Sequence, residues 1–144
     1  MFKVAGSIFV LVSSIFIFCQ KVLKCFFTYK FLLDTVDIIQ KIQFESSANL
    51  IYTKLYENIN FDKNIFFENA KANAYIEDKE ITLVQSFFEE LGKRDKMAEH
   101  EYVDYNLKKF IASSQEYLKK YSEIKKTHFI CGVAAGLFII IFLI

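Results

Sequence analysis

The chain has 144 residues, a formal net charge of +1 and a hydrophobic content of 53%, which includes 17 Phe. This charge balance excludes a protein that is held on nucleic acid by a strongly basic surface. The hydrophobic content exceeds that of an ordinary soluble domain, so part of it is expected to face lipid. The three cysteines, Cys19, Cys25 and Cys131, lie in or beside apolar runs, and this placement supports no disulfide framework.

The first predicted element is an apolar helix near the amino terminus. No charged residue occurs from Val4 to Cys19, and a helix of about 16 residues spans about 24 Å, slightly less than the hydrocarbon core of a bilayer. Bulky residues at positions 16–18 stand where a cleavable signal peptide needs small ones. We predict a retained transmembrane anchor within residues 1–28, with a cleaved signal peptide and a buried core helix as the alternatives.

Residues 29–126 hold nearly all the charged side chains and are predicted to form a helical domain. The chain has no proline, and Gly92 is the only glycine between the two apolar runs, so the turns of a β-meander have no sequence signal. A helix is expected from Phe31 to Phe44, because its apolar residues repeat with the helical period. That stripe consists of Leu32, Val36 and Ile39.

Three shorter helices are expected to follow. Ser46 or Ser47 is a potential cap of the first, Asp62 of the second and Asp78 of the third. Gly92 directly follows the third helix, and glycine is the residue best suited to the left-handed conformation that ends a helix. Their apolar positions are, in order, Ile51, Leu55 and Ile59, then Phe66, Ala70 and Ala74, then Ile81, Val84, Phe88 and Leu91.

Asp95 is a potential cap for a helix that nothing interrupts before the carboxyl terminus, so that it would have about 50 residues and a length of roughly 75 Å. Apolar positions in alternating steps of four and three predict a heptad-like seam, which packs against helices of the same chain or, as the alternative, forms a coiled-coil dimer. Three tyrosines on or near the seam suit a partly wet interface. The seam consists of Val103, Leu107, Phe110, Ser114, Tyr117, Tyr121 and Ile124, with Tyr105 nearby, and the ion pairs Asp104–Lys108 and Glu116–Lys120 are expected on the exposed side.

A second anchor is predicted at residues 127–144, where every residue after His128 is apolar or small. Gly132 and Gly136 form a small-xxx-small pair that lets another helix approach closely, which leaves a homo-oligomer open. Lysines gather on the inner side of both apolar runs, against Lys3 alone outside, so the positive-inside rule predicts a cytoplasmic middle. The inner lysines are Lys21, Lys24, Lys30, Lys119, Lys120, Lys125 and Lys126.

The sequence shows no arrangement that is typical of an enzyme. It lacks a P-loop and a dinucleotide-binding glycine motif, so any nucleotide hydrolysis in the system is expected from another protein. Neither His100 nor His128 belongs to a cluster of metal-ligating residues, and the run Glu99–Glu101 is expected to be a solvated surface. We predict a protein with no catalytic residue, no metal site and no cofactor.

The segment Ser86–Asp95, with the sequence SFFEELGKRD, resembles a stretch of stage III sporulation protein AB, in which one helix ends at Leu-Gly and an aspartate opens the long last helix. The layout is similar over nearly the whole chain: an amino-terminal anchor, a helical middle, a lysine-rich stalk and an apolar tail. This chain is shorter than members of that family between Asn58 and Glu80, and it lacks a proline that often begins their second cytoplasmic helix. These departures leave the helix count open.

The resemblance implies an all-α cytoplasmic bundle of about five to six helices between amino-terminal and carboxyl-terminal transmembrane helices, similar to the inner-membrane platform proteins of type II secretion and type IV pilus machines. It implies a non-enzymatic platform in the mother-cell membrane, within the channel complex that joins mother cell and forespore. The implied partners are a secretion-type ATPase, the other membrane proteins of the complex and membrane lipid. Leu91, Gly92 and Asp95 would form the turn that aims the long helix, and Lys93 and Arg94 are hypothetical contacts for the partner.

Two other classes of function stay open. A two-anchor accessory or regulatory membrane protein would self-associate in lipid without an ATPase, whereas the gene of a platform is expected beside that of a secretion ATPase. An intramembrane enzyme or carrier needs ionisable residues within its anchors, and the two apolar runs contain none. Nucleic acid is not an expected partner.

Overall fold

The computed structural model describes the backbone of residues 2–46 and 61–143, and the side-chain surroundings of residues 15–43, 61–128 and a few positions beyond them. Helices are the only regular structure in this part of the chain: α1 (Phe2–Ser46), α3 (Lys63–Ala72), α4 (Asp78–Glu90) and α5 (Lys96–Leu143). The all-α prediction is therefore confirmed. The helix predicted around residues 51–59 lies outside the described residues.

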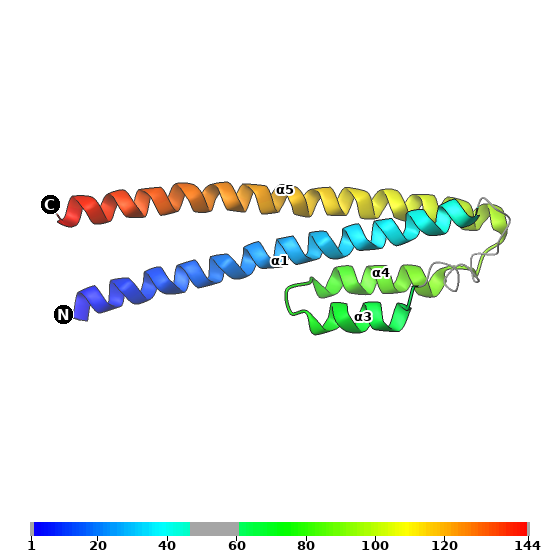
Figure 1. The fold of residues 1–144 in the computed structure, drawn as a ribbon, viewed down its shortest axis with the longest axis horizontal. Helices are drawn as coiled ribbons and strands as arrows, with labels where there is room; N and C mark the ends of the chain where they lie inside the picture. Colours follow the sequence, from blue (N-terminus) through cyan, green and yellow to red (C-terminus); the bar gives the residue numbers. More distant parts are fainter. Residues whose placement is uncertain (1, 47–60, 144) are drawn as a thin grey trace.

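The two long helices, α1 and α5, lie side by side and antiparallel, and they form the long axis of the molecule (Figure 1). α1 has 45 residues and α5 has 48, which correspond to lengths of about 68 and 72 Å. The short helices α3 and α4 form a hairpin against the half of this pair that is farther from the termini (Figure 1). Both termini therefore lie at one end of the molecule, and the turn between α4 and α5 lies at the other.

α1 runs without interruption through the predicted anchor at residues 1–28 and the helix predicted from Phe31 to Phe44. No glycine occurs between Gly6 and Gly92 and the chain has no proline, so no residue in this stretch breaks the hydrogen bonds of the helix. The predicted apolar stripe of its second half is buried, with Leu32 and Ile39 at 0% exposure and Val36 at 8%. One helix thus joins the apolar amino-terminal segment to the core.

The starts of the two short helices are fixed in different ways. Asp62 caps α3, because its carboxylate accepts hydrogen bonds from two backbone N–H groups of the first turn, at 2.9 and 3.1 Å. The prediction that Asp78 caps α4 is wrong, since Asp78 is the first helical residue and the preceding Glu77 makes no side-chain cap hydrogen bond. The backbone N–H of Glu77 donates instead to the hydroxyl oxygen of Thr28 on α1, at 3.0 Å.

The apolar face of α3 differs by one position from the predicted stripe. Phe67 and Ala70 are buried and Phe66 is half-buried. Ala74, which was predicted to continue the stripe, is exposed because the helix has ended before it. Phe67 lies edge-on to Phe88 of α4, with 6.0 Å between the ring centroids, so this face holds the hairpin together.

The predicted seam of α5 packs against α1, so packing within the chain is confirmed. Tyr105 is 67% exposed and lies outside the seam. The seam residues Val103, Leu107, Phe110, Ser114 and Tyr117 are buried, while Tyr121 and Ile124 are half-buried. Both predicted ion pairs are present, Asp104–Lys108 and Glu116–Lys120, each with 2.6 Å between nitrogen and oxygen.

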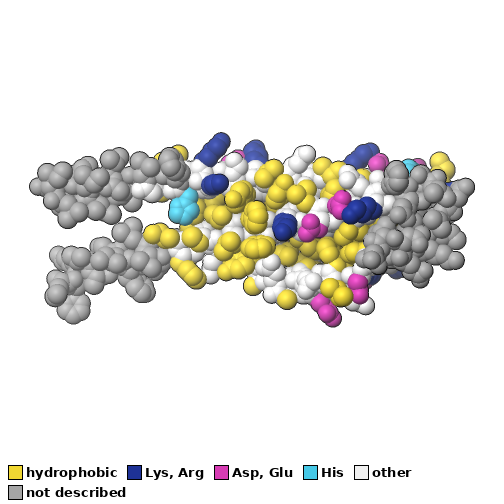
Figure 2. Space-filling view, viewed as in Figure 1, with side chains coloured by type: hydrophobic (Ala, Val, Ile, Leu, Met, Phe, Trp, Pro, Cys, Tyr) yellow, Lys and Arg dark blue, Asp and Glu magenta, His cyan; other side chains and the backbone are white. Residues whose placement is uncertain are grey.

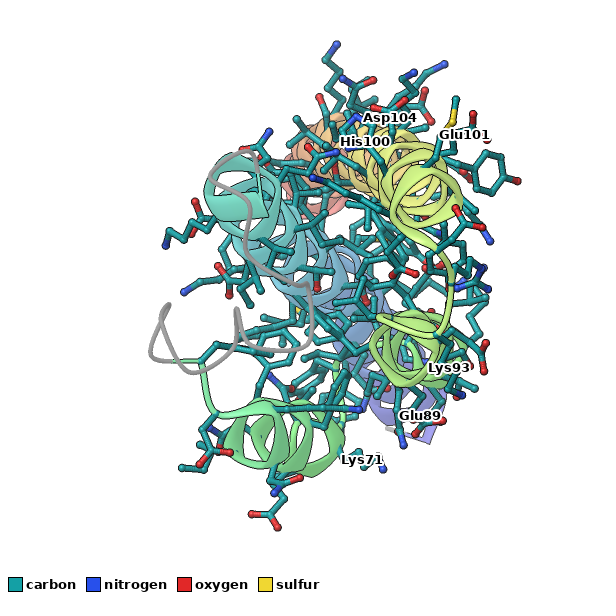
Figure 3. All side chains as sticks on the ribbon, turned by 90° about the vertical axis from the view of Figure 1, so that its right-hand side faces the viewer. Lys71, Glu89, Lys93, His100, Glu101 and Asp104 are labelled. Carbon is teal, nitrogen blue, oxygen red and sulfur yellow. The ribbon has the colours of Figure 1, made fainter. Side chains whose placement is uncertain are left out.

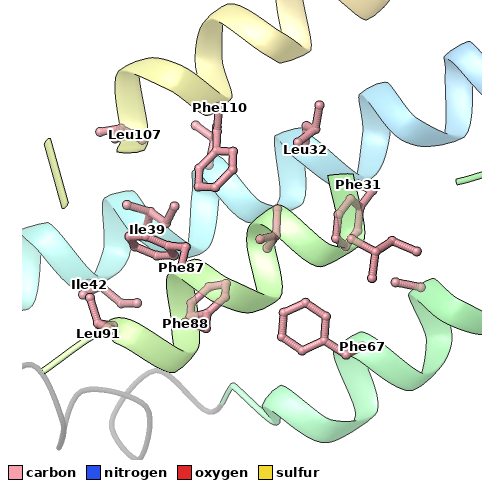
Figure 4. Packing of buried hydrophobic residues seen from close by; sticks show 14 of the residues in the cluster. Phe31, Leu32, Ile39, Ile42, Phe67, Phe87, Phe88, Leu91, Leu107 and Phe110 are labelled. Carbon is pink, nitrogen blue, oxygen red and sulfur yellow. The ribbon is translucent and has the colours of Figure 1, made fainter. Parts of the chain in front are cut away.

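Phenylalanine rings dominate the core between α1, α4 and α5 (Figure 4). Phe87 is 2% exposed and lies edge-on to Phe110 at 5.7 Å and to Phe88 at 5.1 Å between ring centroids. Burial of one such ring contributes about 1.5–3 kcal/mol, and an edge-to-face pair adds about 0.5–1.5 kcal/mol. The other buried residues labelled in Figure 4 are Phe31, Leu32, Ile39, Ile42, Phe67, Leu91 and Leu107.

Among the residues that the structure describes, no helix contains an apolar stretch long enough to cross a bilayer. Most of the side chains in the predicted anchors, residues 1–28 and 127–144, are not among those that the structure describes. Of the predicted small-residue pair, Gly132 has no atom from beyond its own stretch of helix within 4 Å of the place where a Cβ would lie. Gly136 lies outside the residues whose side chains are described.

Candidate functional site

The tip turn, defined here as residues 91–95 between α4 and α5, lies at the end of the molecule farthest from both termini (Figure 1). It begins at Leu91, whose side chain is buried in the core at 7% exposure. Gly92 follows with a φ of 84°, and a residue with a Cβ adopts this left-handed conformation only at a cost of about 1–2 kcal/mol. The chain therefore leaves α4 through an apolar side chain and a glycine.

A buried carboxylate holds the tip turn closed. Glu99, in the first turn of α5, is 1% exposed, and its two oxygens accept hydrogen bonds from the backbone N–H of Gly92 at 2.8 Å and of Arg94 at 3.2 Å. These N–H groups have no helical partner, so an ionised acceptor stabilises them more than a neutral one does. The prediction that Glu99 belongs to a solvated surface is wrong, because its carboxylate is needed inside the turn.

Asp95 completes the turn by starting α5. Its carboxylate accepts hydrogen bonds from the backbone N–H groups of Met97 at 3.1 Å and Ala98 at 3.0 Å, which is the geometry of a helix cap. The acid also lies at the positive end of the helix dipole. The last residue of the turn thus determines where the long helix begins.

Arg94 is tied into the turn by three contacts. Its guanidinium donates to the backbone carbonyl oxygen of Glu90 at 3.0 Å and lies 3.6 Å from the Glu90 carboxylate. It also lies 3.7 Å from the centroid of the Tyr102 ring, a cation–π contact. Burial raises the pKa of the Tyr102 hydroxyl, and the positive charge of Arg94 acts in the opposite direction. Arg94 therefore stabilises the junction of the two helices.

Lys93 has a more open environment than Arg94. Its ammonium group donates to the Glu90 carboxylate at 2.8 Å, while 58% of its side chain stays exposed. This hydrogen bond, together with the positive charge of Lys93, lowers the pKa of the Glu90 carboxyl. Because an exposed pair of this kind is weak and readily exchanged, Lys93 is the more available of the two predicted partner contacts.

The surface around the tip turn carries both signs of charge. Figure 3 looks at this end of the molecule and shows Lys93 and Glu89 beside the end of α4, with Glu101 and Asp104 on the outer side of α5. Asp104 pairs with Lys108 along α5. A surface of alternating charge suits recognition of another protein by charge complementarity.

The described residues include no group of three or more His, Cys, Asp or Glu that could hold a metal ion. The buried polar side chains in this part of the chain are engaged in holding helices and turns. Glu99 holds the tip turn, and Thr35 donates to the backbone carbonyl oxygen of Phe31 at 2.9 Å. The tip turn is thus a hydrogen-bonded turn between two helices.

A second buried carboxylate lies at the other end of α4. Glu80 is 4% exposed and accepts a hydrogen bond from the Tyr117 hydroxyl of α5 at 3.3 Å, with the Lys79 ammonium 3.7 Å away. Burial is the main cause of a strongly raised pKa at the Tyr117 hydroxyl, and the negative charge of Glu80 raises it further. This contact fastens the start of α4 to α5.

Sequence reasoning missed both buried carboxylates, for different reasons. Glu99 had a usable signal, because an acid four residues after the cap Asp95 is near enough in the chain to reach back to the turn. Glu80 had none, since its partner Tyr117 is 37 residues away. The five residues that the sequence singled out, Leu91, Gly92, Lys93, Arg94 and Asp95, do form one turn.

No family model, curated protein or solved structure matches this chain. Its function is therefore inferred from its own sequence and geometry.

Proposed function

We propose that the chain is a non-enzymatic platform in a cell membrane, held by two anchors at one end and offering the tip turn to a soluble partner at the other. By the resemblance of Ser86–Asp95, the machine is the channel complex between mother cell and forespore in sporulation. The partner is then the secretion-type ATPase of that complex, and the helical middle lies on the mother-cell side, in the cytoplasm.

The observation that carries this proposal is the antiparallel arrangement of α1 and α5. The two predicted anchors belong to the ends of these helices that lie together, while the tip turn lies at the opposite end (Figure 1). From Thr127 back to Lys96, α5 alone spans about 46 Å at the rise of an α-helix. A stiff pair of this length keeps the tip turn well clear of a bilayer and passes movement at the tip to the anchors.

The surface where the predicted anchors begin supports a membrane location. Ile15, Phe16 and Ile17 are 54%, 64% and 55% exposed, and Ile130 of α5 is 66% exposed. Three consecutive helical residues point in directions about 100° apart, so their exposure leaves apolar side chains uncovered on several sides of α1. Lysines follow at once on the inner side, starting with Lys21, as the positive-inside rule requires of a cytoplasmic middle.

The surface farther from the termini has a different character. Figure 2 shows hydrophobic side chains gathered along the middle of this face, with charged side chains of both signs beside them. Most described ion pairs there are local ones, such as Asp37–Lys41 at 2.6 Å, while Lys24–Glu77 at 3.6 Å joins α1 to the residue before α4. Such a surface is compatible with water and with a protein partner, which is what the part of a platform outside the membrane requires.

The test is binding of the full chain, reconstituted in lipid nanodiscs, to the secretion-type ATPase encoded beside it. Lys93→Glu reverses an exposed charge at the tip, and Lys109→Glu is the matched control because it reverses an exposed charge farther along α5. We expect the wild type to bind and Lys93→Glu to weaken binding about tenfold, mainly through slower association, while Lys109→Glu binds like the wild type. Absence of binding by the folded wild type would contradict the platform and favour an accessory membrane protein.

A further inference from the structure

A pocket of about 320 Å³ opens between α1 and α3, away from the tip turn. Aromatic rings form much of its lining: Phe27 and Phe31 come from α1 and Phe66 from α3. The rings of Phe31 and Phe66 stack with 5.2 Å between centroids and 21° between planes, which closes the gap between the two helices. Phe31 is only 5% exposed, whereas Phe27 and Phe66 are half-buried, so these two rings offer the accessible apolar surface against which another ring can pack.

The α1 wall of the pocket presents a cation and an anion that are not joined in a salt bridge. Lys30 and Asp34 line the pocket one helical turn apart, and within the described part of the chain they form no ion pair with each other or with another residue. Lys30 precedes Asp34 in the chain, and this order disfavours an ion pair, because an acid that precedes a lysine by four residues pairs with it more readily than the reverse. Three pairs with the favourable order within one helix, Asp37–Lys41, Asp104–Lys108 and Glu116–Lys120, have 2.6 Å between nitrogen and oxygen, whereas Lys119–Glu123, in the reverse order, has 4.0 Å.

The environment of Asp34 also favours binding of a positively charged ligand group to its carboxylate. Partial burial raises the pKa of its carboxyl, and Lys30 counteracts this effect by lowering it, while Asp37 acts in the same direction as burial. A cation bound at the carboxylate would restore the stabilisation that burial removes from its charged form. The side chain nevertheless remains accessible from solvent, so a ligand can reach it.

The α3 wall presents two amides at the same spacing. Asn69 and Asn73 are four residues apart, as Lys30 and Asp34 are, and both line the pocket. The carbonyl oxygen of the Asn73 side chain accepts a hydrogen bond from the backbone N–H of Tyr75 at 3.0 Å, which directs its N–H₂ group to other acceptors. The α1 wall thus carries a cation and an anion one turn apart, and the opposite wall carries two amides, of which Asn73 lies just past the end of α3.

We propose that this pocket binds a small zwitterion that carries a flat apolar group, of which an aromatic α-amino acid is the simplest form. Its carboxylate would meet Lys30 and its ammonium would meet Asp34, while its ring would pack against Phe27 and Phe66. The volume is at the small end of ligand pockets, which fits a single amino acid and excludes a large cofactor. This inference goes beyond the proposed function and does not rest on it.

The first arm of the test compares ligands on the full wild-type chain in lipid nanodiscs, by isothermal titration calorimetry. The probes are L-phenylalanine, phenethylamine, which lacks the carboxylate, 3-phenylpropanoate, which lacks the ammonium, and L-alanine, which lacks the ring. We expect L-phenylalanine to bind, and each other probe to bind about tenfold more weakly, the loss expected for one charge-assisted hydrogen bond or one ring contact. Equal binding of L-phenylalanine and its two charged analogues overturns the proposal, as does no binding at all.

The second arm changes the protein at exposed positions, where folding is not at risk. Asp34→Asn removes the partner of the ammonium, so the preference for L-phenylalanine over 3-phenylpropanoate should disappear while that over phenethylamine stays. Lys30→Gln should do the opposite. Asp37→Asn is the matched control, because Asp37 lies on the same helix and pairs with Lys41 outside the pocket. If Asp37→Asn changes the preferences as much as Asp34→Asn does, the assignment of the charges is wrong.

Discussion

The two ends of α4 are held by different kinds of contact. At its carboxyl end, Glu99 accepts from the backbone N–H groups of Gly92 and Arg94, which are only 7 and 5 residues away in the chain. At its amino end, the partners lie far apart in the chain: Glu77 donates to Thr28 across 49 residues. The Tyr117 hydroxyl likewise reaches Glu80 across 37 residues.

The difference shows which part of the molecule can form without the rest. The hydrogen bonds that close the tip turn join residues near one another in the chain, so this closure depends mainly on the end of α4 and the start of α5. The amino end of α4 has no side-chain cap of its own, and it is fixed only when α1 and α5 are already in place. The tip turn therefore depends on α4 and α5, whereas the other end of α4 also depends on α1.

The largest effect is expected at the carboxylate that closes the tip turn. Glu99→Ala removes both acceptor oxygens from two backbone N–H groups, so the free energy of unfolding should fall by about 2–3 kcal/mol. Guanidinium denaturation of the detergent-solubilised chain measures this change, and faster hydrogen exchange at Gly92 and Arg94 places it at the turn. Glu101→Ala is the control, because Glu101 is exposed on the same helix. If Glu99→Ala and Glu101→Ala destabilise the chain equally, the hydrogen bonds of Glu99 do not hold the tip turn closed.

The next effect is expected at the left-handed residue of the tip turn. Gly92→Ala places a Cβ on a backbone with a φ of 84°, and the free energy of unfolding should fall by about 1–2 kcal/mol. Gly92→Asn should lose less, since asparagine tolerates this conformation better than alanine does. The same denaturation experiment ranks the two, and an Ala variant as stable as the wild type contradicts the assigned backbone.

A smaller effect is expected at the amino end of α4. Tyr117→Phe removes the hydroxyl that donates to Glu80 at 3.3 Å, and the free energy of unfolding should fall by about 0.5–1 kcal/mol. A double-mutant cycle with Glu80→Met, which removes both acceptor oxygens at similar side-chain size, isolates the contact between α4 and α5. Tyr105→Phe is the control, because the Tyr105 side chain is 67% exposed. A coupling energy of zero would mean that this end of α4 is held by packing alone.

The smallest effect concerns an exposed pair on α5. A hydrogen bond from Lys120 lowers the pKa of the Glu116 carboxyl below its ordinary 4.5, and the same bond raises the pKa of Lys120. A lowered carboxyl pKa adds stability above the unfolded value and loses it as the pH falls through the folded pKa. Carbon NMR titration should show the Glu116 pKa rising toward 4.5 in Lys120→Met. A high salt concentration should shift it in the same direction.

The sequence predicts the local features of the fold well because their causes are local. The Asp62 and Asp95 caps, the glycine after α4 and the seam of α5 depend on residues within one or two helical turns. The prediction for Glu99 was wrong despite a local signal, because Glu99 lies in a run of charged residues and was assigned to a solvated surface. A carboxylate near unpaired turn N–H groups is a candidate for burial, and that rule would have found it.

The features that the sequence missed depend on contacts between distant segments. Thr28 takes the role that was assigned to a cap at Asp78, and nothing in either stretch of sequence indicates that α1 passes there. The open pair Lys30 and Asp34 was also not singled out, because its meaning depends on α3 forming the opposite wall. Of the predicted contact residues, Lys93 and Arg94 were treated as equals, whereas Arg94 is bound to Glu90 and Tyr102.

The most direct test of the platform is chemical labelling of the tip turn in membranes. Lys93→Cys and Lys109→Cys are made in a chain whose Cys19, Cys25 and Cys131 are alanine, and inside-out vesicles are treated with a membrane-impermeant maleimide with and without the secretion-type ATPase. We predict that both cysteines are labelled without the ATPase and that the ATPase protects Lys93→Cys alone. Equal labelling of the Lys93→Cys chain in the presence and absence of the ATPase would contradict a contact at the tip turn.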